Sequence, residues 1–288
     1  KHALLIKDKK DNPIEKKFLQ AKSLERAGLY EEAFSIFKEI NKEYPGMNKY
    51  FRPLKNYFKQ IGAFDSLLIY TKEYVESSNY DFQSQLELLE IYIWMDKKEE
   101  WEDIALQLTR NAKENQNVMK NIVQHLINNG KYDFAYELLN DYRKKINKKA
   151  FYSMEMGTFY GMRMVYDKAT KEYLLFLETH PNQLQAISDR IMAFPNDKDI
   201  TNNITHILLK SPLKLSKFIL ADLRFKQKSY KESYKILEDN QASPQILLDY
   251  AKDLAAINEY MIAEEVLTDI INTNINETIV TKAIFELA

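Results

Sequence analysis

A step of the form Gly-x-aromatic-x-x-Ala recurs about every 34 residues along this chain. The clearest copies are Gly28-Leu29-Tyr30-Glu31-Glu32-Ala33 and Gly130-Lys131-Tyr132-Asp133-Phe134-Ala135. Weaker copies centre on the aromatic residues Phe64, Trp101, Tyr166, Tyr230 and Tyr260. A fixed period of this length is typical of solenoids, in which each unit buries its apolar face only against its neighbours. The period therefore predicts an all-α solenoid of about eight helix-turn-helix units.

The first unit explains the spacing. Apolar residues recur at helical intervals on both sides of Gly28, which predicts one helix, a tight turn and a second, antiparallel helix. Gly28 is expected to adopt the left-handed conformation that ends the first helix. Ala33 is small where the two helices approach each other, Phe37 fills the space beyond it, and Pro45 ends the second helix. We expect Ala33 and its counterparts Ala135, Ala169 and Ala263 to be buried.

These residues closely resemble the tetratricopeptide repeat (TPR). The best unit matches nearly every signature position of that family with Gly157, Tyr160, Tyr166, Ala169, Tyr173, Phe176 and Pro181. A second good unit has Ile122, Leu126, Gly130, Tyr132, Ala135 and Leu139. The resemblance covers about residues 14–277. It implies a right-handed superhelix whose first helices line a concave face, and a scaffold that binds other proteins.

The predicted organisation is a single TPR-like solenoid over residues 1–288. The repeats are expected at about 14–47, 48–84, 85–115, 116–149, 150–181, 182–213, 214–243 and 244–277. The repeat at 182–213 has lost the Gly, the Tyr and the Ala, which favours sequence drift over a hinge or a specialised partner contact. Residues 278–288 form either a capping helix or the first helix of a truncated unit. An outward face with Ile279, Ala283 and Phe285 is apolar and favours truncation.

Composition supports the helical interpretation and excludes several function classes. Six glycines and seven prolines are too few for a β-sandwich or barrel. A formal charge of −1 provides no long-range field for nucleic acid or an anionic membrane, and no apolar stretch is long enough to insert into a bilayer. With no cysteine, disulfides and thiolate metal sites are excluded, but the compartment is left open. The frequent Lys, Asn, Ile, Tyr and Phe residues suggest an AT-rich bacterial genome.

The sequence contains no motif in which catalytic or metal-binding residues are expected to come together, so we expect neither an enzyme nor a cofactor. The histidines His2, His125, His180 and His206 are never three or four residues apart, which argues against a helical metal site. Phosphate-binding, dinucleotide-binding, nucleophile-elbow and zinc-protease motifs do not occur. Acidic residues that follow the turn aromatics are expected at the start of second helices, where a carboxylate stabilises the helix dipole.

By analogy with the family, a partner would bind the first helices. The residues expected on that face are Arg52, Asn56, Lys59, Leu89, Ile93, Lys120, Gln124, Phe151, Met154, Phe218 and Phe225. Bands that alternate between basic and apolar would suit an extended peptide or a helix with hydrophobic anchors. The alternative, equally favoured, is that several of these apolar residues only complete the packing between repeats.

Two classes of function follow. The first is a non-catalytic scaffold or adaptor for another protein or a peptide segment, with membership of a larger complex. The second is the sensor or regulatory region of a larger signalling protein, such as a receptor kinase or a peptide-responsive regulator. The subclass that clamps a terminal carboxylate is rejected, because Leu89 and Glu90 stand where it requires amide and basic groups.

Overall fold

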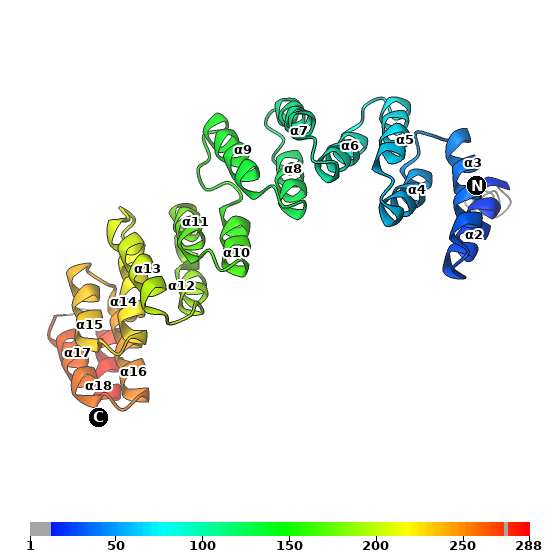
Figure 1. The fold of residues 1–288 in the computed structure, drawn as a ribbon. Helices are drawn as coiled ribbons and strands as arrows, with labels where there is room; N and C mark the ends of the chain where they lie inside the picture. The colour runs from blue at the N-terminus through cyan, green and yellow to red at the C-terminus, as the bar shows by residue number, and fades with distance from the viewer. Residues whose placement is uncertain (1–12, 274–275) are drawn as a thin grey trace, which may run out of the picture. The chain divides into compact units, whose positions relative to one another are not determined.

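The computed structural model describes residues 13–273 and 276–288. These residues form 17 α-helices and one 3-10 helix, with no β-strand among them. The chain divides between Asn147 and Lys148 into two compact units. In each unit most consecutive helices pack against each other as helix-turn-helix pairs (Figure 1). The all-α array of TPR-like hairpins expected from the sequence is confirmed. The single-solenoid boundaries and the right-handed sense stay predictions.

The first unit contains four described hairpins. Their helices are α2 (Pro13–Arg26) with α3 (Tyr30–Glu43), α4 (Asn48–Ile61) with α5 (Phe64–Ser77), α6 (Phe82–Trp94) with α7 (Lys98–Ala112), and α8 (Gln116–Asn128) with α9 (Tyr132–Lys145). We number them hairpins 1 to 4.

The second unit contains hairpins 5 to 8 and a final helix. They are α10 (Ser153–Met162) with α11 (Tyr166–Thr179), α12 (Leu184–Met192) with α13 (Lys198–Lys210), α14 (Leu215–Lys226) with α15 (Tyr230–Asp239), and α16 (Pro244–Ala256) with α17 (Tyr260–Thr273). A 3-10 turn, Pro181–Gln183, precedes α12, and α18 (Glu277–Leu287) packs on α16 and α17. Ala283 of α18 is buried rather than outward-facing, while Phe285 is exposed as expected.

The core runs from hairpin to hairpin. Ala33, Ala135, Ala169 and Ala263 are all buried, as predicted from the repeat. In the first unit one apolar cluster extends from Phe18 on α2 through Phe51 on α4 to Ile91 on α6. Burial of this kind removes apolar surface that a lone hairpin leaves in water, so each hairpin depends on the next for its stability.

The turns of all described hairpins except hairpin 6 contain one residue in the left-handed conformation, even where that residue is not glycine. Gly28, Gly62 and Gly130 end their first helices with φ of 81°, 71° and 77°. The corresponding residues of other hairpins are Asp96, Met164, Lys228 and Asn258, and these also have φ between 54° and 67°. Because a Cβ disfavours the left-handed region, the stacking of the hairpins must hold the non-glycine residues there.

The third hairpin has a register that differs from the prediction. The repeat pattern predicts Trp101 at the turn aromatic, but α7 begins at Lys98 and Trp101 follows three residues later, as Ala33 follows Tyr30 in α3. The buried Trp101 ring contacts Phe134 edge-to-face, with 5.0 Å between ring centroids. A tryptophan therefore fills the position that alanine holds elsewhere.

Hairpin 6, the degenerate repeat, is more open than the others: α12 packs on α14, and α13 packs on α11 and α14, more than the two helices pack on each other. Its turn has no left-handed residue; instead the Asp197 carboxylate caps α13 by accepting hydrogen bonds from the backbone N–H groups of Asp199 and Ile200. The Lys226 ammonium on α14 donates to the carbonyl oxygens of Met192 (2.7 Å) and Phe194 (2.9 Å). Carbonyl groups at the end of α12 are thereby satisfied by the following hairpin.

The close approach of α10 to α11 provides a test of packing. A Cβ on Gly157 would lie 2.5 Å from the Tyr173 ring, whereas one on Gly161 would meet nothing nearer than 3.6 Å. We expect Gly157→Ala to lower the free energy of unfolding by about 1–3 kcal/mol through overpacking. Gly161→Ala on the same helix should be neutral or raise it by up to about 1 kcal/mol, because alanine is the better helix former. Urea titrations of both variants measure this, and equal effects would contradict the packing described.

The left-handed turns provide a second test. Met164 has φ of 62° and is 75% exposed, so Met164→Gly removes backbone strain and little packing. We expect it to raise the free energy of unfolding by about 0.5–1 kcal/mol. The converse change, Gly130→Ala, introduces a Cβ with no atom within 4 Å and should lower it by about 1 kcal/mol through the backbone alone. Thermal unfolding that gave both variants the same sign would be inconsistent with this account.

Candidate functional site

A groove runs between hairpins 1 and 2. Three adjoining hollows form it: Pro53 and Asn56 line both the first and the second, and Tyr30, Tyr57 and Gln60 line both the second and the third. One wall is a face of α4, whose lining residues recur every three or four positions. The other wall is α2 and the start of α3. We call this the α2–α4 groove.

One end of the groove is basic. Lys22, Lys49 and Arg52 line it, together with Phe18 and Asn48, and no carboxylate lines it. The Lys22 ammonium pairs with Glu25 and the Lys49 ammonium pairs with Glu15. Arg52 is exposed and makes no ion pair with the described residues. Its guanidinium is therefore the uncompensated positive charge at this end.

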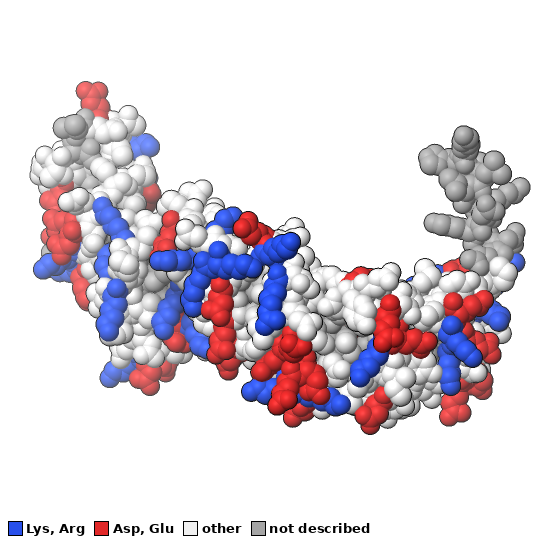
Figure 2. Space-filling view, turned by 90° about the horizontal axis from the view of Figure 1, so that it is seen from above, with Lys and Arg blue, Asp and Glu red and all other residues white. Residues whose placement is uncertain are grey.

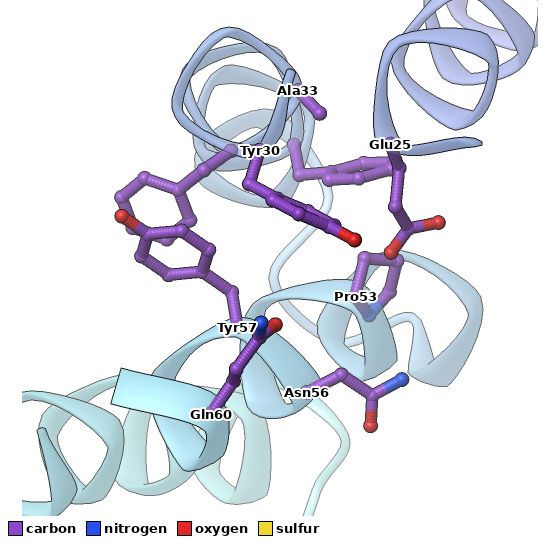
Figure 3. Close-up of a pocket in the computed structure, with 9 residues that line it drawn as sticks. Glu25, Tyr30, Ala33, Pro53, Asn56, Tyr57 and Gln60 are labelled. Atoms are coloured by element: carbon purple, nitrogen blue, oxygen red, sulfur yellow. The ribbon is translucent and has the colours of Figure 1, made fainter. Parts of the chain in front are cut away.

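The middle of the groove is aromatic (Figure 3). The Tyr30 ring reaches from the start of α3 over the hollow, and its hydroxyl points toward Glu25 and Pro53. The Tyr57 ring on α4 stacks on Phe34, with 4.1 Å between centroids and 17° between planes. Asn56 and Gln60 project from α4 beside these rings. The arrangement gives an apolar floor bordered by amide groups.

The far end of the groove lies at the turn between α2 and α3. Leu29 and Ile61 are exposed there, at 45% and 56% of their surface. Glu31 and Glu32 lie in the first turn of α3 and line the same hollow, to which no basic residue contributes. This end is therefore apolar and acidic, in contrast to the other.

Among the residues predicted on the first-helix face, the structure places two in the groove. Arg52 and Asn56 both line it. Lys59 is exposed on the same helix, but its ammonium lies 3.9 Å from the centroid of the Trp94 ring, away from the lining residues.

The other predicted residues have different environments. Leu89, Ile93, Phe151 and Phe218 are buried, so their side chains pack between helices. Lys120, Met154 and Phe225 are half-buried, and Phe225 contacts the rings of Tyr230 and Tyr250 edge-to-face. Gln124 is exposed and donates a hydrogen bond to the Asn128 side chain. For the four buried residues, the packing alternative fits the structure better.

Sequence reasoning missed most of the groove wall. The repeat pattern predicts Tyr30 only as a turn aromatic, and it gives no prediction for Tyr57, Gln60 or Lys22. The signal was available in α4, where Arg52, Asn56 and Gln60 are spaced by four residues, a spacing that aligns side chains along one helix face.

A second polar cluster joins hairpins 2, 3 and 4. The Lys55 ammonium on α4 pairs with both Glu87 and Glu90 on α6, and all three side chains are less than 20% exposed. His125 on α8 lies near them, and its Nε2 has no hydrogen-bond partner among the described residues. Burial lowers the pKa of His125, while Glu90 and Glu87 oppose that shift. The cluster lies between packed helices and links consecutive hairpins.

The second unit has an inter-repeat contact of its own. The Ser188 hydroxyl on α12 donates to the Asp222 carboxylate on α14. The pKa of Asp222 is raised to about 6, chiefly by burial; the Ser188 hydrogen bond opposes the shift, and the charges of Asp189 and Asp253 add to it. Asp222 therefore binds a proton more readily in the folded chain than in the unfolded one.

This raised pKa makes stability depend on pH. A raised folded-state pKa adds stability below the unfolded value of 3.8, and that stability is lost as the pH rises through about 6. We expect Asp222→Asn to raise the free energy of unfolding at pH 7.5 by about 1–3 kcal/mol, with a much smaller effect at pH 4.5. Urea titrations at the two pH values measure the difference. Asp249→Asn, an exposed change on α16, is the control; a pH-independent effect of Asp222→Asn would refute the assignment.

The described residues form no metal-binding cluster, and the face shown in Figure 2 has no large patch of one charge. Basic and acidic side chains are interspersed over the face shown in Figure 2, in keeping with the formal charge of −1. Within residues 13–273 and 276–288, no group of three His, Asp or Glu side chains is arranged to hold a metal ion. No helix in these ranges has the length and apolar character needed to cross a membrane.

Comparison with known proteins gives similarity in structure only. No protein-family model matches the sequence, and no curated protein matches it. One similar solved structure is a tetratricopeptide repeat protein from Parabacteroides merdae ATCC 43184, at 11% identity and a TM-score of 0.37, covering 95% of this chain and 98% of that chain. Another is the human IFIT1 dimer with m7Gppp-AAAA, at 16% identity and a TM-score of 0.34, covering 98% of this chain and 75% of that chain.

Proposed function

We propose that this chain is a non-catalytic scaffold that binds an extended segment of another protein in the α2–α4 groove. The observation that carries the proposal is the series Arg52, Asn56 and Gln60. These exposed side chains follow one face of α4 and make no hydrogen bond or ion pair with the described residues. Hydrogen-bonding groups held in a groove without intramolecular partners are available to a ligand.

The chemistry of the three side chains suits a polypeptide. An amide group both donates and accepts hydrogen bonds, as a peptide backbone does, so Asn56 and Gln60 match the main chain of an extended segment. The Arg52 guanidinium adds a donor for a carboxylate or a carbonyl oxygen. These contacts would position the segment along α4.

Affinity would come from the aromatic floor. Tyr30, Phe34 and Tyr57 form a preformed apolar surface beside the amides, and Tyr30 is 47% exposed. A partner side chain that covers these rings removes apolar area from water, and tyrosine is among the residues enriched at binding hot spots. The proposal includes neither a cofactor nor a nucleic acid.

Alanine substitution on α4 tests this function. A partner is first identified by affinity purification of the full chain with mass spectrometry, and direct binding is then measured with the purified partner by calorimetry. We expect the combined variant Arg52→Ala, Asn56→Ala and Gln60→Ala to weaken binding at least tenfold, about 1.4 kcal/mol. All three positions are exposed, so the fold should be retained.

The matched control changes three exposed residues on α5, namely Lys72→Ala, Glu73→Ala and Glu76→Ala. It should bind like the unmodified chain. A control variant that loses binding while the α4 variant keeps it would move the interaction to the second helices and overturn the groove assignment.

A further inference from the structure

The α2–α4 groove has opposite charges at its two ends, and this asymmetry bears on what it binds. At one end Lys22, Lys49 and Arg52 line the wall, and Arg52 lacks an ion-pair partner among the described residues. At the other end Glu31 and Glu32 line the wall, and neither forms an ion pair within the described part of the chain. A ligand lying along the groove therefore meets positive potential first and negative potential last.

The Glu31 and Glu32 carboxylates at the turn stabilise the start of α3, and they can still bind a positively charged group of a ligand. Glu31 and Glu32 lie in the first turn of α3, where the helix dipole favours negative charge. Both are exposed, so their oxygens remain open to a cation from outside. Between the two charged ends lie the Tyr30 ring and the Tyr57–Phe34 stack, whose ring faces offer apolar surface to a ligand side chain.

The spacing along α4 sets the length of the ligand. Arg52 and Gln60 are eight residues apart, which corresponds to about 12 Å along a helix. An extended polypeptide covers that distance in about four residues. Two oppositely charged side chains at the ends of such a segment would reach the two ends of the groove.

We infer that the partner segment carries an acidic and a basic residue about three to five positions apart, with an aromatic or aliphatic residue between them. This inference rests on the proposed function and specifies its ligand. The acidic side chain lies at Arg52, the apolar one over Tyr30 and Tyr57, and the basic one beside Glu31 and Glu32. Complementary charges at both ends fix the register of the segment and exclude segments of uniform charge.

The same asymmetry disfavours RNA as the ligand. A single strand carries a negative phosphate at every nucleotide, so its phosphates would be attracted to Arg52 and repelled by Glu31 and Glu32. A polypeptide, by contrast, can carry side chains of opposite charge within about 12 Å.

Short synthetic peptides test the inference. The probe is the heptapeptide Ser-Glu-Ser-Phe-Ser-Lys-Ser, acetylated and amidated so that no terminal charge contributes. Three matched peptides replace the charged pair by two Glu, by two Lys or by two Gln. We expect the Glu/Lys peptide to bind the full chain about three- to tenfold more tightly than each of the others in isothermal titration calorimetry at low ionic strength.

Variants that remove charge from one end of the groove test which peptide side chain binds at that end. Arg52→Gln should remove the advantage of the Glu/Lys peptide over the Lys/Lys peptide and leave its advantage over the Glu/Glu peptide. The double change Glu31→Gln and Glu32→Gln should do the reverse. Lys72→Gln on α5 is the charge control and should change neither ratio. Unfolding midpoints of all variants confirm that the fold is retained.

Three results would overturn the inference and separate it from the proposed function. If the Gln/Gln peptide binds as tightly as the Glu/Lys peptide, and the α4 triple-alanine variant binds neither, the groove binds peptides without discriminating between their charges. If no peptide binds, both the inference and the groove proposal fail. If an eight-nucleotide oligo(A) RNA binds in an Arg52-dependent manner and no peptide does, the groove is a nucleic-acid site.

Discussion

The fold depends on burial between consecutive hairpins. A single hairpin leaves one side of its apolar surface in water, and the clusters that run from Phe18 to Ile91 and from Phe218 to Ala283 exist only because the hairpins stack. This constraint keeps small side chains such as Ala33 at close approaches, and it allows a large one, Trp101, where the neighbours leave room. It also confines polar clusters such as Lys55 with Glu87 and Glu90 to the borders between hairpins.

Stacking of the hairpins also determines the backbone conformation of the turn residues. Met164 and Lys228 adopt a left-handed backbone although neither residue favours it. The hairpin geometry therefore comes from the packed helices rather than from the turn residue alone. The same reasoning explains why the degenerate hairpin 6 keeps its two helices after it has lost the Gly, the Tyr and the Ala.

Much of the fold was predictable, because the 34-residue period aligns apolar residues in every unit and a periodic signal tolerates local erosion. The register of α7 was not, because Trp101 is aromatic and was matched to the turn aromatic, although it holds the alanine position. The candidate site was predictable only in part. Arg52 and Asn56 belong to one visible helical face, whereas Tyr30 and Leu29 reach the groove from a different hairpin. Leu89 is buried because neighbouring hairpins pack over it. The sequence pattern does not show how neighbouring hairpins pack, so it could not predict this burial.

Lys226 has a consequence for the way this array can evolve. Repeat proteins are commonly treated as interchangeable modules that duplicate, delete and recombine. Here the end of α12 receives its hydrogen bonds from an ammonium group supplied by α14. Removing hairpin 7 alone, or transplanting hairpin 6 without hairpin 7, would leave the Met192 and Phe194 carbonyl groups without this donor. The two repeats are therefore structurally coupled, and we expect natural variation in repeat number to add or lose them together.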